Sequence, residues 1–295
     1  MKVLNFGSLN VDYVYDVPHF VQPGETITAT ARNIFAGGKG LNQSVAMAKA
    51  GVPVQHAGCI GTDGDILLTA LDESGIDAHF IHRQAAPGGH TVIQVNPSGQ
   101  NCIIVYAGTN RMLSREYIDQ VLGNFGTGDL LVLQNEINEL AYIMDKAYAS
   151  GMQIVFNPSP CDDIIPQLPL EKVKYFIINE IEGALIAQTE EIEDIIPAIR
   201  QKYPQANILL TLGTEGAKYL DGSSLYHQDV FPVKAVDTTA AGDTFLGYFV
   251  YGILNELPPE KTLRIAAKAS SITVSYKGAA GSIPTLEQVV AQLDE

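Results

Sequence analysis

The side chains best placed to do chemistry lie near the C-terminal end, in residues 236–245. Residues 230–236 predict a strand and residues 244–254 predict an apolar helix, so the segment between them is a helix start. The sequence Ala-Ala-Gly at 240–242 would let an anion approach the unpaired N–H groups at the positive end of the helix dipole. Asp243 follows directly, and it is either a simple capping acid or a carboxylate placed beside an anion site.

A second candidate is the glycine-rich turn at residues 36–43, which precedes a predicted helix. A Walker A loop needs Ser or Thr after its lysine, where this chain has Gly40. A dinucleotide fingerprint needs a third small residue, where this chain has Gln43. Both readings fail. What remains is a backbone that can approach a ligand closely, with Lys39 and Asn42 as donors.

The elements that must position these residues are alternating strands and helices. Strands are predicted at 3–7, 54–60, 130–133, 154–156, 175–178 and 208–210, with helices at 44–50, 69–74, 140–149, 258–277 and 285–293. This alternation predicts an α/β fold, a parallel sheet sandwiched by helices. Ligands of such sheets bind at the carboxyl ends of the strands, so polar residues there should share one rim. The residues expected on this rim are Asn10, Asp12, Glu136, Asn179, Thr211 and Asp243.

Two β-rich segments interrupt this pattern. Residues 14–35 contain an alternating run at 26–30, and residues 91–95 and 101–106 surround a Pro/Gly turn as a hairpin does. We therefore predict a single domain over residues 1–295 with a small β-sheet lid inserted at about 12–35 and 90–107. This small sheet would be a lid or a dimerisation surface.

The composition argues against several classes of function. The formal net charge is −15, which argues against binding to nucleic acid or to an anionic membrane surface. Cys59, Cys102 and Cys161 are widely separated, so no zinc site or redox pair is expected. The first residues are too short an apolar run for a signal peptide, and no segment is predicted to span a membrane. We expect a cytoplasmic protein.

Three motifs together resemble those of the ribokinase family of sugar kinases. They are Gly-Gly-Lys-Gly-Leu-Asn-Gln at 37–43, Asn179-x-x-Glu182, and Asp-Thr-Thr-Ala-Ala-Gly-Asp at 237–243. Their order and spacing fit, and residues 8–12 and 23–26 are also similar. The resemblance implies a ribokinase-like fold whose lid clasps a second subunit in a homodimer. It also implies transfer of the γ-phosphoryl group of ATP to a primary hydroxyl of a furanose, D-ribose being the first choice.

The resemblance also implies roles for individual residues. Asp243 would be the catalytic base, and the amides of Ala240, Ala241 and Gly242 would form the anion hole. The sugar-binding set would be Asn10, Asp12, Gly38, Lys39, Asn42 and Glu136, with Asp243. ATP would be bound by Asn179, Thr211, Gly213, Gly216, Gly242 and Ala267. Glu182 would organise Mg²⁺ through waters, and K⁺ would be held by Asp237, Thr239, Thr273, Tyr276, Gly278 and Ser282, mainly through backbone oxygens.

Several positions on the sugar side depart from the ribokinase pattern. They are Gly-His-Thr at 89–91, Gly-Thr-Asn-Arg-Met at 108–112, and Asn135. These departures do not change the expected reaction, but they allow a different substrate: another sugar, a sugar phosphate or a nucleoside. Arg111 would favour a phosphorylated substrate if it faced the pocket, although arginine is more often a surface residue. A sugar-binding protein without catalysis is a further alternative, and the presence of Asp243 argues against it.

Overall fold

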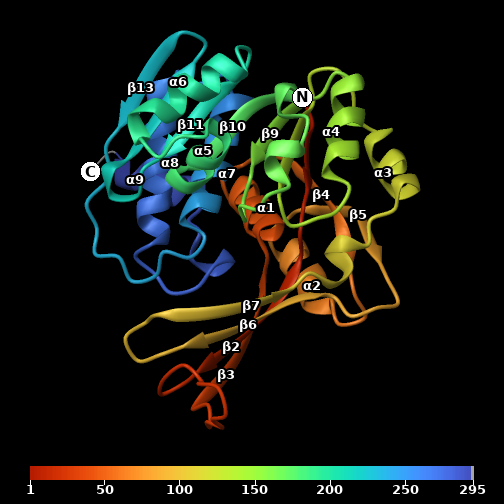
Figure 1. Ribbon diagram of the computed structural model, residues 1–295, viewed down its shortest axis with the longest axis vertical. Helices are drawn as coiled ribbons and strands as arrows, with labels where there is room; N and C mark the ends of the chain where they lie inside the picture. Colours follow the sequence, from red (N-terminus) through yellow and green to blue (C-terminus); the bar gives the residue numbers. More distant parts are fainter. Residues whose placement is uncertain (294–295) are drawn as a thin grey trace.

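The structure, a computed structural model, describes residues 1–293 of the 295-residue chain. Its main element is a sheet of nine strands among these residues, in the order β13-β12-β11-β10-β9-β8-β1-β4-β5 (Figure 1). The strands are parallel except that β12 is antiparallel to both of its neighbours. Their bounds are β1 Val3–Phe6, β4 Val54–Ile60, β5 Asp77–Arg83, β8 Leu130–Gln134, β9 Gln153–Asn157, β10 Val173–Asn179, β11 Asn207–Thr211, β12 Ala217–Asp221 and β13 Ser224–Gln228.

Helices cover both faces of this sheet, because successive residues of its strands point to opposite sides. In β1, Val3 packs into one apolar cluster and Leu4 into another. The first cluster includes residues of α1 (Lys39–Lys49), α2 (Asp65–Glu73), α7 (Ala241–Leu254), α8 (Pro259–Thr273) and α9 (Leu286–Leu293). The second includes residues of α3 (Arg115–Leu122), α4 (Leu140–Ala149), α5 (Glu180–Ala187) and α6 (Ile192–Lys202). The predicted α/β sandwich is therefore confirmed.

A separate four-stranded sheet projects from this body and forms the lid (Figure 1). Its order is β3-β2-β6-β7, with bounds β2 Asn10–Asp16, β3 Ala31–Gly37, β6 Gly89–Val95 and β7 Asn101–Tyr106. The central strands β2 and β6 are parallel, and each pairs with its outer neighbour in antiparallel register. The small β-sheet lid expected from the sequence is present.

Short 3₁₀ turns complete the chain at η1 Gly108–Arg111, η2 Ile165–Gln167, η3 Leu170–Lys172, η4 Gly213–Glu215 and η5 Ala280–Ser282. Within residues 1–293, no helix has both the length and the apolar character needed to cross a bilayer.

Some local predictions were wrong. Residues 230–236 are irregular and form no strand. Pro232 has no N–H for a ladder, and Phe231 packs instead under Arg264 and Lys268 of α8, at 5.4 and 5.1 Å from its ring centre. The alternating run at 26–30 is also outside any strand, because β2 pairs with residues 31–37.

The ends of several elements also differ from expectation. Helix α8 ends at Thr273, four residues before the predicted end, and α1 begins at Lys39, inside the glycine-rich turn. The first strand ends at Phe6, and Asn10 and Asp12, which were expected on the rim of the main sheet, lie on the lid strand β2.

Candidate active site

The start of α7 presents backbone donors to open space. Ala240 has a left-handed backbone with φ 60°, and its carbonyl accepts the N–H of Thr244 at 2.8 Å. The Ala241 N–H donates to the Thr238 carbonyl at 3.3 Å, whereas those of Ala240, Gly242 and Asp243 have no acceptor within residues 1–293. A Cβ added to Gly242 would meet nothing within 4 Å. Free N–H groups at a helix start with room in front of them suit a phosphate.

The carboxylate of Asp243 lies beside these amides and is only 5% exposed. Its Oδ1 accepts a hydrogen bond from Gln43 Nε2 at 2.9 Å and lies 3.4 Å from Lys39 Nζ. Its Oδ2 lies 3.4 Å from Asn42 Nδ2. All three partners come from α1, which packs closely on α7. The structure therefore brings the glycine-rich motif and the C-terminal motif together around one carboxylate.

Lys39 lies at the centre of the acidic groups of the site. Burial lowers the pKa of Lys39, but Asp243, Glu136 and Glu182 together outweigh that effect and raise it. The lysine is therefore held as a cation. Its backbone N–H also donates to Glu136 Oε2 at 3.1 Å, and the Ser8 hydroxyl donates to the same oxygen. Lys39 thus connects Glu136 to Asp243.

Glycine is required where α1 begins, because the chain passes very close to residues 7–10. Gly38 has φ 93°, a left-handed conformation that favours glycine. A Cβ on Gly40 would lie 2.4 Å from the Ser8 backbone nitrogen. The glycines of this motif therefore serve close backbone packing, and they place the Lys39 N–H over Glu136.

The lid contributes further polar groups to the site. Asp12 Oδ1 accepts a hydrogen bond from the Thr91 hydroxyl at 2.6 Å. Burial raises the pKa of Asp12 to about 6, with Thr91 opposing and Glu136 adding to the rise. Asn10 Oδ1 accepts from Asn110 Nδ2 at 2.7 Å, so the amide of Asn10 is left to donate toward a ligand.

Asn179 and Glu182 form a capping box at the start of α5. Glu182 N donates to Asn179 Oδ1 at 2.9 Å, and Asn179 N donates to Glu182 Oε2 at 3.0 Å. Asn157 Nδ2 donates to the same carboxylate oxygen at 3.2 Å. Burial raises the pKa of Glu182, although Asn179 and Lys39 oppose the rise. Glu182 is thus a carboxylate fixed by two donors, the N–H of Asn179 and the amide of Asn157.

The expected nucleotide loop lies between β11 and β12. Thr211 ends β11 and donates its hydroxyl to the Ile178 carbonyl at 3.3 Å. Gly213 and Gly216 have φ 52° and 89°, and a Cβ on Gly216 would lie 2.1 Å from the Gln228 carbonyl oxygen. Ala267 is buried in α8, which packs on the same face of the sheet. Helix α8 and β12, the strand that follows the loop, therefore both pack in the first apolar cluster.

The residues expected to hold K⁺ come from two segments that Asp237 joins. Its Oδ1 accepts the Thr239 N–H at 2.9 Å and its Oδ2 accepts the Gly278 N–H at 3.0 Å. Burial alone would raise the pKa of Asp237, but these donors outweigh it and lower it. The hydroxyl of Ser282 donates to the Gly278 carbonyl at 2.8 Å, and the Thr273 hydroxyl lies 3.0 Å from that of Thr244.

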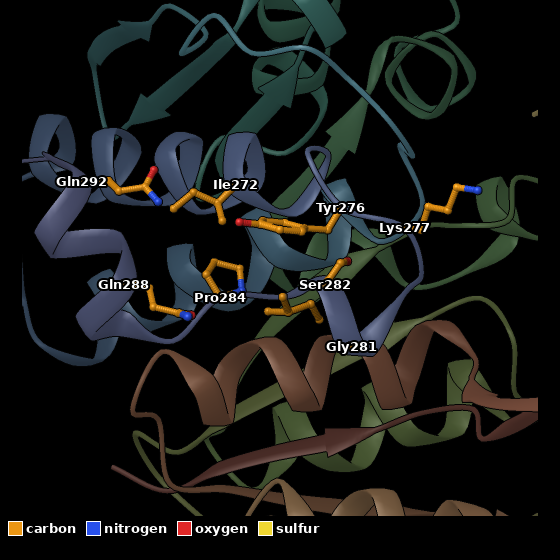
Figure 2. Close-up of a pocket in the computed structure, with 9 residues that line it drawn as sticks. Ile272, Tyr276, Lys277, Gly281, Ser282, Pro284, Gln288 and Gln292 are labelled. Carbon is orange, nitrogen blue, oxygen red and sulfur yellow. The ribbon is translucent and has the colours of Figure 1, made fainter.

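A pocket of ≈ 440 Å³ borders the second of these segments (Figure 2). Figure 2 shows the Tyr276 ring directed along this pocket toward Ile272, with Lys277 pointing away. Its lining includes none of Asp243, Lys39 or the lid residues. The pocket is therefore separate from the site built around Asp243, and Tyr276 is largely exposed in it.

Several contributors to the site did not stand out in the sequence. Gln43, Ser8, Thr91, Asn110 and Asn157 all bond to residues of the predicted set. Gln43 and Ser8 lie inside recognised motifs, and Asn157 directly follows a predicted strand, so their positions carried a signal. Thr91 and Asn110 lie in segments that departed from the expected pattern. Arg111, which shares the segment of Asn110, is exposed.

This fold, with a small sheet beside a helix start that carries a buried carboxylate, is that of the ribokinase-like sugar kinases. A ribokinase from Thermotoga maritima superposes with a TM-score of 0.90 and 32% identity, covering 100% of both chains. Arabidopsis thaliana ribokinase, solved with ribose and ATP, gives a TM-score of 0.89 and 29% identity, covering 100% of this chain and 99% of the other.

The chain belongs to the pfkB family of carbohydrate kinases, whose sequence profile matches residues 1–286. It is 33% identical to the ribokinase of Haemophilus influenzae, over 98% of this chain and 97% of the relative. It is also 30% identical to a deoxyribokinase of Salmonella typhimurium, over 98% of this chain and 97% of that relative. The protein is therefore a carbohydrate kinase, and both ribose and deoxyribose enzymes are among its relatives.

Proposed function

We propose that this kinase transfers the γ-phosphoryl group of ATP to the 5-hydroxyl of D-ribose, giving ribose 5-phosphate. The observation that carries the proposal is the buried Oδ1 of Asn42, which has no hydrogen-bond donor within residues 1–293. Asn42 donates from its Nδ2 toward Asp243, so its oxygen is available to a donor beside the base. A hydroxyl of a bound sugar would supply that donor and remove the penalty of an unpaired buried acceptor.

Asp243 would accept the proton of the attacking hydroxyl, and the hydroxyl oxygen would bond to the γ-phosphorus as ADP leaves. The amides of Ala240, Ala241 and Gly242 would stabilise charge on the transferring group. Reorientation of the Ala241 N–H from the Thr238 carbonyl, a long bond of 3.3 Å, would complete this set. Because phosphoryl transfer depends on positioning and electrostatics, an immobile helix start is well suited to it.

The sugar would be bound by the polar groups between the lid and α1. Asp12 and Glu136 present carboxylate oxygens, and Asn10 and Lys39 present donors, a combination that matches adjacent hydroxyls. Gly38 would let the backbone approach the ring. A carboxylate that accepts from two neighbouring hydroxyls would favour ribose over a sugar that lacks one of them.

ATP would extend from the anion hole toward Asn179, Thr211, Gly213, Gly216 and Ala267. Glu182 would hold Mg²⁺ through waters, and the ion would neutralise charge on the phosphate oxygens. A single fixed carboxylate fits an ion that keeps most of its waters. K⁺ would be held by Asp237, Thr239, Thr273, Tyr276, Gly278 and Ser282. The donor set there, carbonyl and hydroxyl oxygens near one carboxylate, fits a hard cation.

We also propose that the lid dimerises. Four consecutive residues of the outer strand β7, Ile103 to Tyr106, are each at least 50% exposed, and Phe35 of β3 is 49% exposed. Ile103, Val105 and Phe35 share the lid face that carries Asp12, according to the strand pairings. An apolar face of this kind on a strand edge favours pairing with a second copy.

Another substrate of the same family is the second candidate, because a deoxyribokinase is among the relatives. A panel of D-ribose, 2-deoxyribose, a hexose, a sugar phosphate and a nucleoside, assayed by coupled ADP release, distinguishes them. D-Ribose should give the highest kcat/KM. If D-ribose gave no turnover while another substrate did, the proposed substrate would be wrong. Exposure of Arg111 offers no support for a phosphorylated substrate.

The mechanism is tested with Asp243→Asn, which keeps the size of the side chain. We expect the variant to fold and bind sugar while its kcat falls by roughly 10²–10⁴-fold, the range for loss of a general base. Sugar binding is measured by calorimetry and turnover by ADP release. Near-normal turnover would show that Asp243 is not the base.

A further inference from the structure

A row of four polar side chains, three of them buried and one half-buried, crosses the sheet on the face covered by α1 and α7. Asn5, His56, Gln134 and Asn157 come from the four neighbouring strands β1, β4, β8 and β9. Each follows an apolar residue two positions earlier that packs into the first apolar cluster, so period-two alternation places all four on this face. Buried polar groups cost free energy unless they are hydrogen-bonded, and in the described residues the one buried atom of these side chains without a partner is Gln134 Oε1.

The hydrogen bonds between Gln134 and His56 all donate toward His56. Burial lowers the pKa of His56 to about 4, so its ring is neutral. Its Nε2 faces the Gly7 carbonyl at 3.4 Å and carries the proton, which leaves Nδ1 to accept the Ser44 hydroxyl at 2.7 Å. The Ser44 oxygen in turn accepts from Asn5 Nδ2 at 2.8 Å.

The direction of donation reverses at Gln134, which donates toward Asn5 on one side and toward Gln43 and the catalytic carboxylate on the other. Asn5 Oδ1 accepts from Gln134 Nε2 at 2.9 Å, and Gln134 Nε2 also donates to Gln43 Oε1 at 2.7 Å. Gln43 Nε2 then donates to Asp243 Oδ1 at 2.9 Å and to Asn157 Oδ1 at 3.1 Å. A flipped Gln43 amide would place oxygen against both of those oxygens and nitrogen against the nitrogen of Gln134. The network therefore holds this amide in one orientation.

We propose that Gln43 is a positioning residue of the transfer reaction: its amide, held by Gln134 and Asn5, fixes the Asp243 carboxylate and links it to Asn157. This inference rests on the proposed function. Among the three side chains of α1 that approach Asp243, Gln43 makes the contact of 2.9 Å, while those of Lys39 and Asn42 are 3.4 Å. Gln43 thus sets the direction in which Asp243 meets a hydroxyl.

The link to Asn157 gives Gln43 a second effect. Asn157 donates to Glu182, so the two amide groups of Gln43 and Asn157 connect the base on the sugar side with the carboxylate on the nucleotide side. A misplacement of about 1 Å at a reacting group lowers the rate by roughly 10²-fold. Loss of Gln43 should therefore lower kcat, while the groups that contact the sugar hydroxyls remain in place.

The test compares Gln43→Met with Gln120→Met, the same change at an exposed glutamine of α3. Both are assayed with ATP and the best substrate of the wild-type panel. For Gln43→Met we expect kcat to fall about 10- to 100-fold with the sugar KM changed less than about threefold. Gln120→Met should match the wild type. A folded Gln43→Met protein with kcat within about threefold of wild type would overturn the proposal.

Gln134→Met is the second test, because it removes the hydrogen bond that Gln134 donates to Gln43 and leaves Gln43 unchanged. Its kcat should fall with little change in KM, and the double variant should be no slower than Gln43→Met alone, since both changes act through one amide. Multiplied effects in the double variant would refute the positioning by Gln134. If Gln43→Met does not fold, an unchanged kcat in Gln134→Met would overturn the proposal. Absence of kinase activity in the wild type would instead refute the proposed function.

Discussion

Replacement of Asp12 by Asn should stabilise the ligand-free protein and weaken sugar binding. The pKa of Asp12 rises from its ordinary 3.8 to about 6, mainly because the carboxyl is buried. One pKa unit corresponds to 1.36 kcal/mol, so above pH 6 the ionised carboxylate destabilises the folded state by about 3 kcal/mol. Asn removes that charge and can still accept the hydrogen bond of Thr91.

The sign of the pH dependence follows from the raised pKa. Below about pH 4 Asp12 is protonated in both the folded and the unfolded chain, and the wild type loses nothing relative to Asp12→Asn. Between pH 4 and 6 the wild type loses this stability progressively. For 295 residues, an unfolding entropy of about 2.1 cal/mol/K per residue converts 3 kcal/mol into a Tm difference of about 5 °C.

The assay is thermal unfolding of both proteins from pH 4 to 8 without ligand, together with the sugar KM at pH 7.5. Asp12→Asn should melt about 5 °C higher at pH 8 and within about 1 °C of the wild type at pH 4. Its KM should rise about 10- to 100-fold, the value of a lost hydrogen bond to a charged group. An Asp12→Asn protein that melts at or below the wild-type temperature at pH 8 would refute the reasoning.

Three further outcomes follow from the structure. Asn179→Ala removes the cap of α5 and should lower the free energy of unfolding in urea titrations by about 1 kcal/mol. The KM for ATP should rise because Glu182 is no longer held by the capping box, and an unchanged KM would contradict this role. Val105→Lys should convert a dimer into a monomer in sedimentation experiments, and a wild-type monomer would refute the proposed lid contact. Replacement of K⁺ by a bulky organic cation should lower kcat, and equal rates would remove the cation site at Asp237.

The sequence was sufficient for the central parallel strands of the main sheet, since they are short apolar runs separated by helices, but it did not predict the outer strands β5, β12 and β13. The lid hairpin at 91–106 was predictable because alternation and a Pro/Gly turn coincide there. The prediction of a strand at 230–236 was wrong because of contacts with other elements, which its own residue pattern does not show. The outer strand β13 pairs with β12, and Phe231 packs against α8. Local propensity carries no information about which edge of a sheet is available.

The candidate site was predictable where motifs lie in one segment and not where contacts cross the chain. Asp243 and Lys39 were expected because each lies in a recognisable turn. The bond from Gln43 to Asp243 joins residues 200 positions apart, and the chain through Gln134 depends on strand order. Strand parity places Asn5 and Gln134 on one face, but only the sheet order β8-β1-β4 brings them into contact.

Thermal stability and turnover favour different residues in this polar row. Interior amides contribute less to folding than apolar side chains of the same volume, so replacements such as Asn5→Leu or Gln134→Met, if they packed well, would be retained in a search for heat resistance. The same replacements would release Gln43 and slow the kinase. Variants selected for high melting temperature alone should therefore accumulate changes in this row and lose activity, whereas variants selected for turnover should keep it.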